Sequence, residues 1–134
     1  MKRNKEIENL PINFRHEKQY ILINNLDSWE KLKDLSTKDI NQIIVRSPLC
    51  TESRLIKIRA IATFIFFLNL TPQEGYLLLH CGVGSMKALS ILNPHNLEKN
   101  IGRLERSLKI KMTEPINLIK IKHWISKAKI LEDY

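Results

Sequence analysis

Apolar side chains recur along this chain with the spacing of α-helices rather than of β-strands. Ile40, Ile43 and Ile44 lie three or four residues apart among polar residues, so they fall on one face of a helix. The segment 60–68 is apolar on every side and is expected to lie in the core. No segment alternates apolar and polar residues convincingly. The pattern predicts an all-α fold.

Residues that cap helices mark where the predicted helices begin. Thr51 precedes a helix over 52–68, Ser36 with Asp39 begins one that reaches about 45, and Asp27 with Glu30 begins a short one through 33. Further starts are Thr71-Pro72, Ser85, Asn93-Pro94 and Thr113-Glu114-Pro115, for helices that end near 81, 92, 110 and 131. A helix over 14–23 comes before them all. With 134 residues, we expect a single helical domain over 14–134, preceded by a flexible tail over 1–13.

Two segments of the chain match at an offset of 57 residues. Residues 21–44 and 78–101 align without a gap, and four leucine or serine pairs are identical. These pairs are Leu22 with Leu79, Ser28 with Ser85, Leu32 with Leu89, and Leu35 with Leu92. The match predicts a unit that occurs twice, at about 16–46 and 73–110. The helix over 52–68 connects the two units, and a basic helix over about 114–131 follows them.

The segment 82–88, which reads Gly-Val-Gly-Ser-Met-Lys-Ala, carries the clearest chemical motif of the sequence. Glycine adopts a positive φ readily, so the chain can reverse here, while Val83 anchors the turn in the core. Without side chains at 82 and 84, a phosphate can approach the backbone N–H groups at the start of the next helix. The segment resembles the helix-hairpin-helix motif of nucleic-acid-binding proteins.

The resemblance extends over about residues 16–110, because two such units joined by a helix are similar to the tandem form of that fold. The overall run also resembles an uncharacterised cyanobacterial family with helix-hairpin-helix repeats. That similarity rests on Ser47-Pro48, 54–62, 77–80, 102–106 and Trp124-Ile125. In the first unit, Asn25 and Asp27 replace the two glycines. Asp27 places a negative charge where a phosphate would sit, so we expect the first hairpin to be structural.

The charge of the chain favours an anionic partner. There are 22 Lys and Arg residues against 14 Asp and Glu residues, a net charge of +8, and Lys99, Arg103 and Arg106 share one face of a predicted helix. We expect binding of nucleic acid without sequence specificity, and of double-stranded DNA rather than RNA, because no aromatic stacking surface is evident. The residues expected to hold the backbone phosphates are Gly82, Val83, Gly84, Ser85, Lys87, Lys99, Arg103 and Arg106.

The alternative function is a small helical adaptor in a larger complex, with the basic face on an acidic protein surface. An exposed apolar patch around Trp124 or Tyr76 would favour that alternative. Arg54, Lys57 and Arg59 oppose the macrodipole at the start of the 52–68 helix, which hints at a phosphate or an acidic partner. The sequence does not name the partner or the oligomeric state.

Other functional classes find no support in the sequence. It has no P-loop, Ser–His–Asp pattern or carboxylate pair, so we expect neither an enzyme nor a cofactor. His80 and His95 are expected in the core rather than in a metal site. The chain has two cysteines, a polar N-terminus and no apolar run of ~20 residues, so we expect a reduced, cytoplasmic protein without a membrane span.

Overall fold

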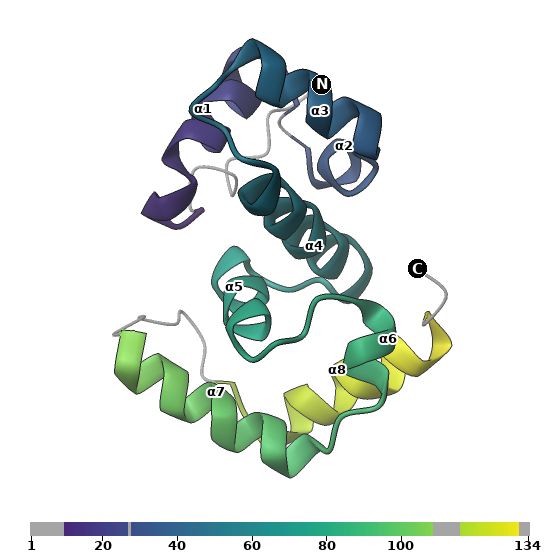
Figure 1. Ribbon diagram of the computed structural model, residues 1–134. Helices are drawn as coiled ribbons and strands as arrows, with labels where there is room; N and C mark the ends of the chain where they lie inside the picture. The colour runs from purple at the N-terminus through teal and green to yellow at the C-terminus, as the bar shows by residue number, and fades with distance from the viewer. Residues whose placement is uncertain (1–9, 27, 109–115, 132–134) are drawn as a thin grey trace. The chain divides into compact units, whose positions relative to one another are not determined.

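In the computed structural model, which describes residues 10–26, 28–108 and 116–131, all regular secondary structure of the described residues is helical (Figure 1). The predicted all-α fold class is therefore confirmed. The chain divides into two compact units, Met1–Pro72 and Gln73–Tyr134, and each is described here by itself. The prediction of one domain over 14–134 stays a prediction.

The described part of the first unit consists of a short 3₁₀ helix, η2, and the helices α1 to α4 (Figure 1). Their bounds are η2 Ile12–Phe14, α1 Arg15–Ile23, α2 Trp29–Lys33, α3 Thr37–Arg46 and α4 Glu52–Leu68. Both α2 and α3 pack against α4, whose buried residues include Leu55, Ile58 and Phe64. The predicted tail over 1–13 falls mostly on residues outside the described ones, but Leu10 is buried, and Ile12 and Asn13 belong to η2.

The second unit repeats this order of elements with the helices α5 to α8. Their bounds are α5 Pro72–His80, α6 Met86–Ser90, α7 Pro94–Leu108 and α8 Leu118–Ile130. Both α6 and α7 pack against α8, whose buried residues include Ile121, Trp124 and Ala128. Burial of Trp124 confirms that this residue belongs to the core.

Helix starts agree with the sequence where a side chain caps the helix locally. Ser36 and Asp39 form a capping box at α3, and the Thr51 hydroxyl accepts the Arg54 N–H at the start of α4. At α2 the capping side chain is Ser28 rather than the predicted Asp27, which lies outside the described residues. The cap of α8 is Asn117, while the predicted start at 113–115 also lies outside them.

The 57-residue offset holds from α1 to the start of α3, and for the turn between α1 and α2. Helices α1 and α2 begin and end 57 positions before α5 and α6, and α3 begins 57 positions before α7. In the two turns, Asn25 (φ 57°) and Gly82 (φ 83°) occupy matching positions in left-handed backbone. Matching backbone bonds run from Leu26 N–H to Ile21 C=O and from Val83 N–H to Leu78 C=O, each 3.0 Å long.

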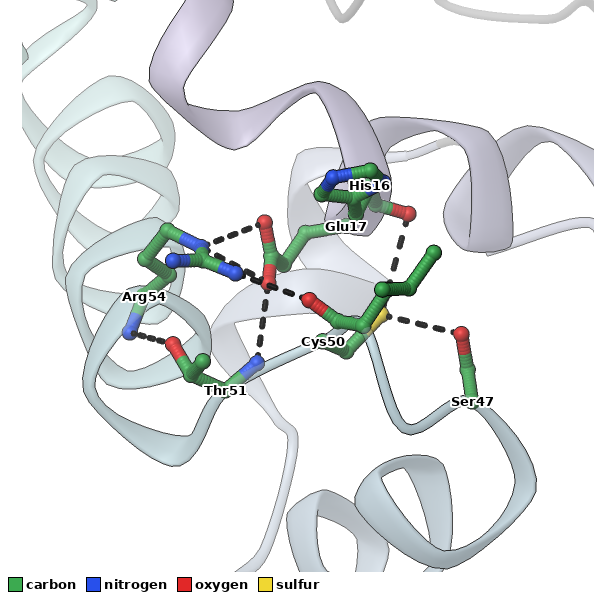
Figure 2. Close-up of polar contacts among 7 residues, drawn as sticks. His16, Glu17, Ser47, Cys50, Thr51 and Arg54 are labelled. Atoms are coloured by element: carbon green, nitrogen blue, oxygen red, sulfur yellow. Dashed lines mark hydrogen bonds and ion pairs between the residues drawn. The ribbon is translucent and has the colours of Figure 1, made fainter.

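A buried glutamate fastens α1 to the start of α4 in the first unit (Figure 2). The Glu17 carboxylate is fully buried, accepts the Thr51 N–H at 2.9 Å and pairs with Nε of Arg54 at 2.9 Å. Cys50 is buried beside it, and its thiol donates to the His16 carbonyl at 3.7 Å. Burial raises the pKa of the Cys50 thiol, because the thiolate would lose its hydration.

The second unit has the same arrangement at Glu74, which lies 57 positions after Glu17. The Glu74 carboxylate is almost fully buried and pairs with Nζ of Lys120 at 2.7 Å. Lys120 and Arg54 both occupy the third position of their helices, and their N–H groups donate to the capping side chains of Asn117 and Thr51. Each unit therefore compensates a buried carboxylate with a cation from the first turn of its last helix.

Candidate functional site

The turn that joins α5 to α6 projects its backbone into solvent while its centre is anchored in the core. Gly82 has a φ of +83° and is exposed, whereas Val83 is only 2% exposed. A Cβ atom built at Gly84 would meet nothing within 4 Å, so the backbone is open on that side. Burial of Val83 confirms its predicted role as the anchor of the turn.

Not all N–H groups of the turn are available to a ligand. The Gly82 N–H donates to the Leu79 carbonyl and the Val83 N–H to the Leu78 carbonyl, both at 3.0 Å. The N–H groups of Gly84 and Ser85 have no acceptor among the described residues. The expectation that this turn binds a phosphate stays a prediction, and within it the Gly84 and Ser85 N–H groups are the available donors, whereas those of Gly82 and Val83 are already used. These two residues shape the turn instead.

Basic side chains of α6 and α7 are exposed on the same unit. Lys87 on α6 and Lys99, Arg103 and Arg106 on α7 are all solvent-exposed. On the opposite side of α7, Leu97 and Ile101 are buried. Because α6 and α7 both pack against α8, these four cations belong to one packed group of helices. None of the four forms an ion pair with a described residue.

The matching turn of the first unit has different chemistry. Glu30 stands at the position of Lys87, and the Lys31 Nζ donates to the Asn25 carbonyl at 3.0 Å. The first turn therefore already binds a cation of its own unit, Lys31. Asp27, which matches Gly84 in the sequence, lies outside the described residues.

Two of the three cations in the first half of α4 have partners inside the first unit. Arg54 pairs with Glu17, and the Arg59 guanidinium donates to the Leu35 carbonyl at 3.0 Å. Only Lys57 of the three is fully on the surface. These internal partners explain why arginines occur near the start of α4, where the helix macrodipole disfavours positive charge. For Arg54 and Arg59, an external anion is therefore not needed to explain the charge.

The structure corrects the prediction for two histidines. His80 and His95 are exposed rather than in the core, and the His80 ring makes an edge-to-face contact with Tyr76 at 4.4 Å between ring centroids. Tyr76 itself is partly buried. Among the described residues, no group of three His, Cys, Asp or Glu residues is arranged to hold a metal ion.

Sequence reasoning missed the pairs of Glu17 with Arg54 and of Glu74 with Lys120. The signal was the recurrence of glutamate at an offset of 57 residues, just before the aligned segments. Partial burial of Cys81 in the second turn raises the pKa of its thiol, in the same direction as for Cys50. No helix within the described ranges is long and apolar enough to cross a membrane.

Comparison with known proteins gives a family but no further relative. No curated protein matches the chain, and neither does any solved structure. Residues 12–131 match the family model described as a domain of unknown function, DUF4332. This match covers both units and all eight α-helices of the described residues. The chain therefore belongs to the DUF4332 family.

Proposed function

We propose that the second unit binds the backbone of double-stranded DNA without sequence specificity, in the manner of helix-hairpin-helix proteins. The observation that carries the proposal is the turn at 82–85, where unpartnered N–H groups of Gly84 and Ser85 lie on an open backbone. One phosphate would accept from these N–H groups, and the cations of α6 and α7 would neutralise its neighbours. Contacts of this kind position a protein on a duplex but do not read its sequence.

The correspondence between the units supports joint action of the turn and α7. In the first unit, Leu26 of the turn and Arg46 of α3 line the same surface pocket. At the offset of 57 residues these positions become Val83 and Arg103. A cation on α7 at this position is suited to contact a phosphate next to the one bound by the turn.

The adaptor alternative receives less support from the second unit. Trp124 is buried and Tyr76 is partly buried, so neither forms the exposed apolar patch that this alternative favours. An acidic protein surface would use the same four cations as a duplex. Absence of duplex binding would therefore redirect the search to acidic proteins.

The sharpest variant is Gly84→Asp, because it introduces the residue that the first unit carries at the matching position. Gly84 has room for a side chain, whereas Gly82 is in left-handed backbone that a side chain would strain. We expect Gly84→Asp to weaken binding to a short duplex about tenfold or more, since a carboxylate would face the phosphate. Fluorescence anisotropy at two salt concentrations measures the affinity and its salt dependence.

The matched control is Gln19→Glu, which changes the net charge equally on the exposed face of α1. It should leave duplex affinity within about twofold of wild type. For the wild type, four phosphate contacts by side chains give a log–log salt slope of about −3.6. Equal losses of duplex affinity in the two variants would mean that the duplex is attracted only by the net charge of the chain. No binding at low salt would reject the proposal.

A further inference from the structure

The first unit contains a surface pocket of about 420 Å³ between its first turn, α2 and α3. Its apolar lining comes from Leu26, Leu35 and Ile43, with the Tyr20 ring beside them. Leu35 and Ile43 are buried, so they form the floor of the pocket. A cavity of this size accommodates one large residue or a small ligand, but not a helix.

Most charged groups around the pocket are already engaged. The Asp39 carboxylate accepts the Ser36 N–H at 2.9 Å, and Asp34 pairs with the Lys33 ammonium at 2.8 Å. The Lys31 ammonium donates to the Asn25 carbonyl. Each of the two carboxylates at the pocket therefore already has a donor beside it.

Two polar side chains at the pocket have no partner among the described residues. These are the Gln42 amide and the Arg46 guanidinium, one turn apart on the exposed side of α3. A guanidinium offers two parallel N–H groups that match a carboxylate, and an adjacent amide adds a third donor. Together with the apolar floor, they suit a ligand that has a carboxylate next to an apolar side chain.

We propose that this pocket binds the C-terminal residue of a partner protein, one with an apolar side chain. The C-terminal residue carries both required groups on a single Cα atom, which fits a pocket with room for one residue. Its side chain would cover Leu35 and Ile43, and its carboxylate would accept from Arg46 and Gln42. The site is independent of the DNA-binding proposal, because it involves only residues of the first unit.

The test uses the ¹⁵N-labelled full chain and the peptide acetyl-Ala-Ala-Leu, once with a free carboxylate and once as the C-terminal amide. We expect saturable amide shifts centred on Leu26, Leu35 and Gln42 in heteronuclear correlation spectra. The free acid should bind about fivefold more tightly than the amide, as is reasonable for a charge-assisted pair that is partly exposed to solvent. Arg46→Gln should remove this preference.

Arg15→Gln is the matched control, because Arg15 is exposed on α1 and does not line the pocket. This variant should keep the preference for the free acid, and circular dichroism verifies that both variants are folded. The proposal fails if no saturable shifts occur at millimolar peptide, if acid and amide bind equally, or if Arg15→Gln loses the preference as well. Tighter binding of the internal-acid peptide acetyl-Asp-Leu-amide would assign the pocket to an acidic segment and overturn the C-terminal assignment.

Discussion

At the scale of single residues, the stability of the first unit depends on how the buried charge of Glu17 is compensated. Its carboxylate has no exposed surface, and Arg54 supplies the matching charge at 2.9 Å. Removing one partner of such a pair is costly, because the other charge stays buried alone. We expect Arg54→Met to lower the free energy of unfolding by about 2–3 kcal/mol, discounted because Arg54 is partly exposed. Urea denaturation followed by circular dichroism measures this loss.

Lys57→Met is the control for that experiment, since Lys57 lies on the surface of the same helix. Its effect should stay within about 0.5 kcal/mol, as is usual for a surface substitution. Equal effects of the two variants would contradict the assignment of Arg54 as the counterion of Glu17.

At the scale of elements, the capping box of α3 makes the stability of this helix depend on pH. The Asp39 carboxylate accepts the Ser36 N–H, and this bond lowers the Asp39 pKa below its ordinary value of 3.8. A lowered pKa in the folded state gives stability that is present above the ordinary pKa and is lost as the pH falls through the folded value. We expect Asp39→Asn to be less stable than wild type at neutral pH, and the difference to shrink below about pH 4. Thermal unfolding across this range tests it, and a difference independent of pH would contradict it.

Among the helices, starts that depend on local caps could be predicted from the sequence, whereas long-range pairs could not. The start of α4 at Thr51 and the box of Ser36 with Asp39 were predicted correctly, because caps are bonds between residues three positions apart. The helix α6 ends at Ser90, earlier than predicted, at the position that matches the end of α2 at Lys33. Long-range partners leave no local pattern, so the pairing of Glu17 with Arg54 was not predicted.

For the candidate site, the sequence could predict which residues take part but not which of their groups are available. The glycines and their spacing indicated a turn, and Gly82 does adopt the left-handed backbone that this spacing favours. Which N–H groups stay free could not be read from the sequence, because the bond from Val83 to Leu78 depends on how the turn closes on α5. For the cations of α7, the sequence predicted only that Lys99, Arg103 and Arg106 share one face of the helix. The structure confirms that this face is exposed.

At the scale of the whole molecule, the two units share a backbone plan but differ in charge at matching positions. Glu30 matches Lys87, and Gln42 of α3 matches Lys99 of α7 at the same offset. Exposed charges of this kind contribute little to stability, so the two units can differ here without a cost to the fold. The net charge of +8 is therefore less informative than its placement.

Two triple variants, each of which removes three positive charges, test whether duplex binding depends on where the charges lie or only on the net charge. One changes Lys99, Arg103 and Arg106 of α7 to Gln, and the other changes the exposed Arg15, Lys38 and Lys57 of the first unit. If the α7 face neutralises phosphates, the first variant should reduce the magnitude of the duplex salt slope by about 2.7, and the second should leave it nearly unchanged. Anisotropy titrations over a series of salt concentrations give both slopes. Equal reductions would mean that the duplex responds to the total charge of the chain, and the α7 face would then lose its assigned role.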